Sequence, residues 1–232
     1  MANRARNMPG SEPQTETIQE IQTLKNFEAI YEKNKKPINT VFTILFVAIV
    51  GYFAYDKLYK APQEDKAANA VSFAQRYFEV DSMNRALNGD GQHNGFLQVM
   101  KKYSGTNVAN LCHYYAGVCY LKLGDFNKAV KELKDFDPKG TMLQYTAWGL
   151  LGDAYMEMNK QKEALEYYEK AIGNKDDKNL TPTYLYRAAL VCEMSNKTED
   201  AKKMYLRIRD EFPKSPQSRD VIKNLARLGV TE

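Results

Sequence analysis

The sequence predicts an all-α chain in which one apolar helix near the N-terminus precedes a stack of helical hairpins. Three observations support this prediction. The stretch 37–55 carries no charged side chain. Three later segments repeat one pattern of small and large residues at intervals of 35 and 37 residues. Short polar connections, GDF, NKQ and NKT, interrupt these segments, and such connections are typical of tightly turned helical hairpins.

Residues 1–36 are expected to form a cytoplasmic N-terminal segment. Residues 1–14 are polar with Gly and Pro and predict disorder. Thr17 and Glu20 then have capping-box spacing. One helical stripe follows, made of Ile18, Ile21, Leu24 and Tyr31. The pattern predicts a short amphipathic helix that lies on the membrane or on a partner subunit. A helix that only extends the following apolar stretch is the alternative.

The stretch 37–55 is predicted to be a transmembrane helix. Nineteen helical residues span about 28 Å, which is close to the thickness of the hydrocarbon core. We expect an uncleaved anchor, because no A-x-A-like cleavage site follows the apolar run; a buried helix of a soluble domain is the alternative. Lysines flank both ends with a slight excess before the stretch, which favours a cytoplasmic N-terminus. The side chains expected at the membrane interfaces are Tyr52, Tyr55, Tyr59, Lys35 and Lys36.

Residues 56–66 are expected to be a linker in which Pro62 breaks the helix. Residues 67–109 then predict a degenerate first hairpin. One apolar stripe, Val71, Ala74 and Phe78, lies in a first helix that extends to about residue 87. The turn cluster NGDGQHNG follows. A lone carboxylate in it, Asp90, lacks the other ligands of a calcium loop, so a plain loop is expected.

Residues 110–213 predict three copies of one helical hairpin. A small residue in the first helix is followed 12 residues later by a small residue in the second, and the pairs are Gly117 and Ala129, Gly152 and Ala164, and Ala189 and Ala201. Large side chains recur in the same frame, at Leu133, Tyr168 and Tyr205. Small side chains allow two helices to approach closely where they cross. Residues 214–232 predict a capping helix whose apolar face carries Val221, Ile222, Leu225 and Leu228.

This pattern resembles the tetratricopeptide repeat, a helix–turn–helix unit of about 34 residues. The second copy matches its pattern at Trp148, Leu151, Gly152, Tyr155, Ala164, Tyr168 and Ala171. The third copy supplies the terminal proline, Pro213, but has Cys192 where the first helix usually carries Tyr. The resemblance implies a tetratricopeptide-repeat α-solenoid with a concave groove that binds proteins or peptides.

Composition and motifs argue against other classes of function. The formal net charge is +4 and no basic run is longer than Lys35–Lys36, so no nucleic-acid partner is expected. Three cysteines do not indicate a disulfide framework. Cys112 beside His113 lacks a second ligand pair, so we expect no metal and no cofactor. Catalytic motifs are also lacking, and the chain is not expected to be an enzyme.

The resemblance also implies which residues line the groove, since the first helix of each repeat forms most of it. Carried onto this sequence, the protein- or peptide-binding positions are Leu111, Tyr114, Val118, Leu121, Thr146, Gly149, Asp153, Met156, Thr183, Tyr186, Leu190 and Glu193. Repeats that grip the carboxylate tail of cytosolic chaperones present Lys, Arg and Asn here. In this sequence only Arg187 is basic among the matching sites, which disfavours a receptor of that kind.

The layout of helix, anchor and repeats is similar to that of the YfgM family, which accompanies the bacterial SecYEG translocon. The similarity is strongest in FEAIYEKNKKPINTVFTILFVAIVGYFAYDKLY, residues 27–59. It implies a single-pass protein of the bacterial inner membrane with periplasmic repeats. The implied partners are SecYEG-type channel subunits, a periplasmic chaperone and translocating polypeptide. The alternatives are a scaffold of another cell-envelope complex and an organelle import receptor with cytosolic repeats.

Overall fold

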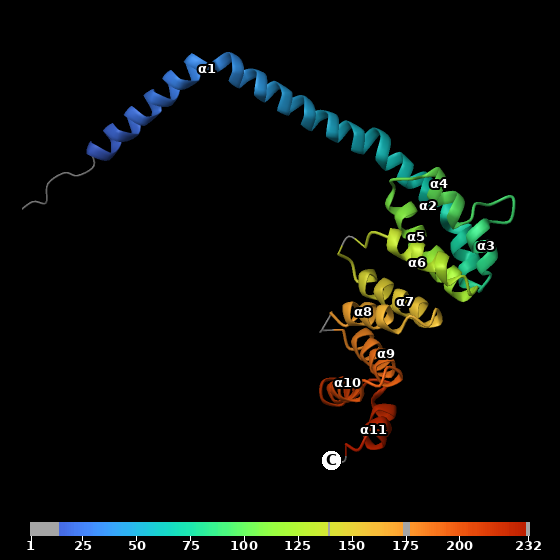
Figure 1. Cartoon of the computed structure of the whole chain (residues 1–232). Coiled ribbons are helices and arrows are strands. Elements are labelled where there is room, and N and C mark those ends of the chain that lie inside the picture. Colours follow the sequence, from blue (N-terminus) through green and yellow to red (C-terminus); the bar gives the residue numbers. More distant parts are fainter. Residues whose placement is uncertain (1–13, 139, 174–176, 231–232) are drawn as a thin grey trace, which may run out of the picture. The chain divides into compact units, whose positions relative to one another are not determined.

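The computed structural model describes residues 14–138, 140–173 and 177–230 (Figure 1). Side chains are described from residue 31 onward. The regular elements of these residues are all helical. Two compact units divide the chain between Tyr59 and Lys60, and each is described by itself. The expectation for residues 1–14 lies almost wholly outside the described residues.

The first unit is built on α1 (Gln14–Tyr55). The helical stretch before residue 37 is continuous with the apolar stretch, which is the alternative considered above, and is not a separate short helix. The helix runs through Pro37 and is bent within its blue segment (Figure 1). Proline removes one backbone hydrogen bond and commonly kinks a helix. Pro37 does not end α1. Thr17 lies inside α1, so it does not cap the helix start. The stripe Ile18, Ile21 and Leu24 lies outside the described side chains.

The apolar stretch of α1 is exposed along nearly its whole length. Among the described residues, one helix is long and apolar enough to cross a membrane, with a mean hydropathy of 1.9 over its most apolar window and none of that window buried. The hydroxyls of Thr40 and Thr43 donate to the carbonyls of Lys36 and Asn39 at 2.9 and 2.7 Å. These polar side chains therefore have partners within the helix. Tyr52, Tyr55 and Tyr59 are all more than half exposed.

The predicted linker 56–66 is helical, and the expectation that Pro62 breaks a helix is wrong. A π-helical turn, η1 (Asp56–Lys60), is followed by α2 (Ala61–Glu79). Pro62 lies in the first turn of α2. Proline is tolerated at this position because the first N–H groups of a helix have no intrahelical partner.

The region 67–109 folds as three helices instead of the predicted two. They are α2, α3 (Met83–Asn88) and α4 (Phe96–Lys102). The break after α2 falls at Asp81, whose φ is +59°. The next amide, that of Ser82, donates to the carbonyl of Tyr77 at 2.8 Å, as in a Schellman motif. Glycine usually occupies the left-handed position of this motif. Here the residue is Asp81, so the sequence pattern did not indicate that a helix ends at this point.

The three predicted repeats are present as helix pairs stacked in chain order (Figure 1). The pairs are α5 (Asn107–Lys122) with α6 (Phe126–Asp135), α7 (Leu143–Glu157) with α8 (Gln161–Ala171), and α9 (Leu180–Met194) with α10 (Thr198–Glu211). Each turn has one residue in the left-handed region, namely Gly124, Asn159 and Asn196. The same backbone bond closes each turn, from Asp125 to Tyr120, Lys160 to Tyr155 and Lys197 to Cys192, at 2.8–2.9 Å.

The small residues lie where the paired helices meet, as predicted. A Cβ added to Gly117 would lie 2.5 Å from Cγ of Leu133. One added to Gly152 would lie 2.5 Å from the ring of Tyr168. Both distances are too short for any side chain to fit without movement. The 12-residue spacing therefore reflects direct contact between the two helices of a repeat.

The capping helix α11 (Ser218–Arg227) packs on the last repeat through Val221 and Leu225, which are buried. The prediction is wrong for Ile222, whose side chain is 56% exposed. Neighbouring residues on a helix are about 100° apart, so Val221 and Ile222 cannot both face the core fully.

The contact at Gly152 gives a stability prediction. Gly152→Leu overpacks the α7–α8 crossing and should lower the free energy of unfolding of a fragment of residues 60–232 by about 1–3 kcal/mol. Urea unfolding followed by circular dichroism measures this change. Glu169→Leu, on the exposed face of α8, is the matched control and should change it by less than about 0.5 kcal/mol. Equal effects of the two substitutions would show that Gly152 is not a contact point.

Candidate functional site

An open groove of about 770 Å³ runs across the first helices of the three repeats. Each of these helices contributes residues three or four positions apart, which lie on one face of a helix. The groove is lined by Val118, Leu121, Lys122, Gly124 and Phe126 from the first repeat, Leu150, Asp153, Met156, Glu157 and Tyr168 from the second, and Arg187, Leu190, Val191 and Met194 from the third.

The structure brings five of the twelve predicted groove residues together in this cavity. They are Val118, Leu121, Asp153, Met156 and Leu190. These five residues of α5, α7 and α9 therefore line one cavity. Leu190 is 38% exposed and offers apolar surface to solvent. Whether these side chains bind a partner stays a prediction.

Four predicted residues of the first two repeats lie elsewhere. Gly149 is buried beneath Tyr184 of the next repeat, and a Cβ on it would lie 2.0 Å from that ring. Tyr114 packs against Phe136, with ring centroids 5.5 Å apart. Leu111 lines a separate cavity of about 160 Å³ shared with α2. Thr146 is partly buried and does not line the groove. These four residues therefore lie outside the groove, and of them Gly149 is covered by a side chain of the next repeat.

The other three misplaced residues lie on α9, and two of them contact the capping helix. Tyr186 packs beside Tyr205, with ring centroids 5.9 Å apart, and its hydroxyl lies 3.5 Å from the Asn224 amide of α11. Glu193 accepts a hydrogen bond from the Tyr205 hydroxyl and pairs with Arg227 at 2.6 Å. Thr183 accepts a hydrogen bond from Gln217. The capping segment therefore occupies the end of the surface that was predicted to bind a partner.

Sequence reasoning missed several residues that line the groove. Phe126 opens the second helix of its repeat, and Met194 ends the first helix of the third, 59% exposed. Leu150 lies about one turn before Asp153 on α7, and Met156 lies about one turn after it. The available signal for Leu150 and Met194 was their spacing of three or four residues from predicted groove residues; Phe126, on the next helix, had no such signal.

An ion pair crosses the floor of the groove from the second repeat to the third. Asp153 accepts a hydrogen bond from the Tyr168 hydroxyl at 2.7 Å and pairs with the guanidinium of Arg187. The Asp153 side chain is 30% exposed and that of Arg187 is 41% exposed. Burial, together with the Asp153 carboxylate, raises the pKa of Tyr168, so its hydroxyl stays a donor at neutral pH. Burial also raises the pKa of Tyr184, on which Arg187 lies, to about 12.

The charges along the groove are balanced. Its described lining residues carry two cations, Lys122 and Arg187, and two carboxylates, Asp153 and Glu157. Lys122 is also paired with Asp81 at 2.5 Å. Since both cations already have acidic partners, the groove has no cationic clamp for a carboxylate tail. Apolar contact, and not charge, is what this surface offers.

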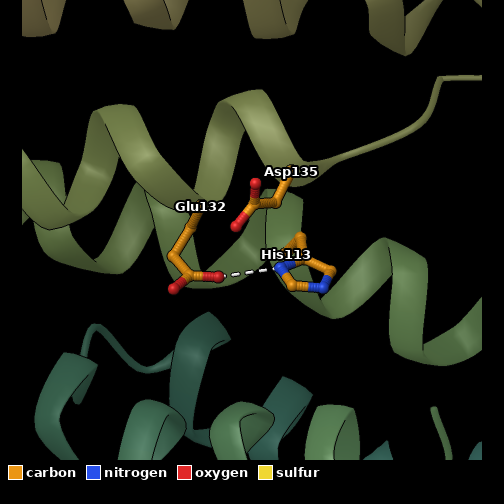
Figure 2. Close-up of side chains that lie close together, drawn as sticks. All are labelled: His113, Glu132 and Asp135. Atoms are coloured by element: carbon orange, nitrogen blue, oxygen red, sulfur yellow. Dashed lines mark hydrogen bonds and ion pairs between the residues drawn. The ribbon is translucent and has the colours of Figure 1, made fainter.

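A second cluster lies between α5 and α6 (Figure 2). His113 Nδ1 is 2.7 Å from Glu132 Oε2, and Asp135 lies beside them, with one ligand atom from each residue within 4.8 Å of the others. The hydrogen bond from His113 holds the pKa of Glu132 below its usual range. The sequence search missed this cluster because His113 and Glu132 are 19 residues apart and meet only when the two helices pack.

The other residues considered as metal ligands have structural roles. Asp90 accepts hydrogen bonds from the Tyr77 hydroxyl at 2.6 Å and from the amide of His93 at 2.6 Å. These bonds lower its pKa, and they fix its loop. Cys112 and Cys119 are buried, and burial raises the pKa of each to about 12. Both are therefore neutral thiols in the core.

The hydrogen bond between Tyr168 and Asp153 can be measured in a double-mutant cycle. Tyr168→Phe keeps the ring on Gly152 and removes the donor, so it should cost about 0.5–1.5 kcal/mol of unfolding free energy. In an Asp153→Ala background the same change should cost less by about 1 kcal/mol, because the bond is already gone. Urea unfolding of the four proteins gives the coupling. Additive costs would mean that the bond does not hold α7 to α8.

Comparisons with known proteins support this reading of the repeats. Tetratricopeptide-repeat family models match residues 145–178, and also 112–136 and 184–215. These ranges coincide with the α7–α8, α5–α6 and α9–α10 pairs. No curated protein matches the sequence.

Solved structures of MamA are similar in fold. One MamA crystal structure has a TM-score of 0.53 and 15% identity, covering 72% of this chain and 91% of its own. MamA 41-end from Desulfovibrio magneticus RS-1 has a TM-score of 0.50 and 14% identity, covering 81% and 93%. A MamA RS-1 double mutant has a TM-score of 0.50 and 16% identity with the same coverage. At such identities the likeness concerns the fold alone. The chain thus carries tetratricopeptide repeats that stack as an α-solenoid, a scaffold for protein–protein interaction.

Proposed function

We propose that this protein is a membrane-anchored scaffold that binds a segment of a partner protein in the groove of its repeats. The observation that carries the proposal is the apolar lining of the groove, in which both cations are already paired with carboxylates. Buried apolar contact supplies most of the energy at such surfaces. The groove has the volume of a typical ligand site, about 300–1,000 Å³, which suits a few side chains of an extended or helical segment.

The chemistry of the lining defines the kind of partner. Val118, Leu121, Leu150 and Leu190 are aliphatic, and Met156 and Met194 lie beside them. Methionine side chains are flexible and polarizable, so they adapt to different apolar partners. The occupant is therefore a protein segment with two or three apolar side chains on one face and little net charge.

The layout supports a more specific role at a membrane. An apolar helix with no buried side chains in its most apolar part, α1, precedes the repeats. Tyr52, Tyr55 and Tyr59 are exposed near its C-terminal end, as in interfacial aromatic belts. In this proposal α1 anchors the protein in the bacterial inner membrane, with a cytoplasmic N-terminus and periplasmic repeats. The protein then serves as an accessory subunit of the SecYEG translocon and works with a periplasmic chaperone.

A scaffold of another cell-envelope complex is the second candidate, since it has the same anchor and the same groove. An organelle import receptor that binds chaperone tails is less consistent with the structure, because the groove cations are paired with carboxylates. Partner identification separates the first two candidates, and topology separates both from the third.

Groove binding is tested by charge substitution at exposed apolar positions. Leu190→Asp and Met194→Asp place a carboxylate in the groove, and each should lower the recovery of partners in a cross-linked pull-down at least tenfold, which corresponds to about 1.4 kcal/mol. Ile222→Asp, 56% exposed on α11, is the matched control outside the groove and should leave recovery unchanged. Equal losses in all three variants, or no loss in any, would contradict the assignment of the groove.

The anchor is tested by fractionation and protease protection. The full chain should stay with membranes after a carbonate wash, because about 19 apolar residues insert into the bilayer. In spheroplasts the repeats should be digested by added protease, while in intact cells they should be protected. Repeats that resist protease in spheroplasts would place them in the cytoplasm and reject the translocon role. Replacing residues 37–55 with an unrelated anchor should remove SecYEG subunits from the recovered partners.

A further inference from the structure

The cluster of His113, Glu132 and Asp135 is not used by the proposed groove. His113 projects from α5, and the two carboxylates project from α6, three residues apart on one face (Figure 2). Histidine and carboxylates from two different helices converge here, with one ligand atom from each within 4.8 Å of the others.

We propose that His113, Glu132 and Asp135 bind a divalent transition-metal ion, with Zn²⁺ the ion that fits best, and that this ion joins the two helices of the first repeat. The inference is independent of the partner that the groove binds.

The spacing of the donors suits zinc. Zinc binds nitrogen and oxygen ligands at about 2.0–2.2 Å in a tetrahedron, so ligand atoms lie about 3.4 Å apart around it. The His113–Glu132 distance is 2.7 Å, and the largest separation in the cluster is within 4.8 Å. Small side-chain rotations place the three donors at the required separation. The two carboxylates also balance the charge of the ion.

The kind of donor distinguishes among ions. Imidazole nitrogen is preferred by zinc and neighbouring transition metals, whereas magnesium and calcium take six or more oxygen ligands. Three protein ligands leave a fourth position for water. His113 and Asp135 both line an open cavity of about 260 Å³. This cavity gives the ion a path to the cluster and room for the water.

The buried member of the cluster is held in an ionised form. The Glu132 side chain is only 10% exposed and accepts from His113 on one oxygen. Its other oxygen has Lys131 Nζ at 3.5 Å, and the Lys131 side chain is 71% exposed. At 3.5 Å this exposed lysine is a weak partner for the carboxylate. Burying a carboxylate is costly unless a positive charge compensates it, and a metal ion supplies that charge better than an exposed lysine.

Among the residues that the structure describes, no second group of three such ligands lies as close together. The chain has two histidines; the second, His93, stacks on Phe73 and pairs with one carboxylate, Asp90. Cys112 precedes His113 in the chain, but its thiol is buried and neutral. His93 therefore provides a matched control for His113.

The experiment uses the full chain in detergent after removal of metal by a chelator. Zn²⁺ is titrated by calorimetry, and thermal unfolding is followed with Zn²⁺, Mg²⁺ or no metal. We expect one Zn²⁺ per chain and a rise in Tm with Zn²⁺ but not with Mg²⁺, since an ion that binds only the folded state stabilises it. Co²⁺ in its place should give the visible absorption of a four-coordinate site.

The variants locate the ion. His113→Ala and Asp135→Asn should each weaken Zn²⁺ binding by more than about 100-fold, the upper range for loss of an outer-shell partner, while His93→Ala should bind as the unchanged protein does. Asp135 is exposed, so Asp135→Asn decides the question if His113→Ala unfolds the repeat. No binding by the full chain, full binding by Asp135→Asn, or loss of binding in His93→Ala overturns the proposal. An equal Tm rise with Mg²⁺ overturns the choice of ion.

Discussion

The close contact between the two helices of each repeat is the constraint on which the groove depends. Tyr168 shows how. Its ring lies on Gly152, where a Cβ would be 2.5 Å away, and its hydroxyl donates to Asp153. One side chain therefore packs the hairpin and also fixes a carboxylate on the concave face. A larger residue at position 152 would move the ring and the hydrogen bond together.

The Asp153 carboxylate also links the second repeat to the third. It pairs with Arg187 of α9, and Gly149 on the same helix admits the Tyr184 ring of α9. Packing and charge thus join α7 to α9 at two adjacent points. The exposed apolar side chains of the groove, such as Leu190 and Met194, project from helices that are held on both sides. A rigid frame of this kind lowers the entropic cost of binding a partner.

The repeat frame could be predicted from the sequence because its signals are local. The small residues of one hairpin are 12 positions apart, and Gly124, Asn159 and Asn196 mark the turns where the chain takes a positive φ. The helix boundaries near Pro62 and Asp81 were harder to predict. Proline also fits the first turn of a helix, and aspartate takes the left-handed conformation less often than glycine.

The binding surface was predicted less completely because it depends on distant contacts. Gly149 was expected in the groove, yet Tyr184 from the next repeat covers it. Tyr186 and Glu193 were expected there too, yet the capping segment engages them. His113 and Glu132 meet across 19 residues, and no local spacing indicates that. A single helix face defines candidate positions, and only the packing of neighbouring helices decides which of them stay open.

The central claim is that a partner segment occupies the apolar groove, and site-specific photo-cross-linking in living cells tests it most directly. A photoreactive residue is placed at Leu190 in the groove or at Ile222 on α11, both exposed in the free protein. The account predicts strong cross-links to a defined partner from position 190 and weak or none from position 222. Cross-links of equal strength from both positions, or from position 222 alone, would contradict it.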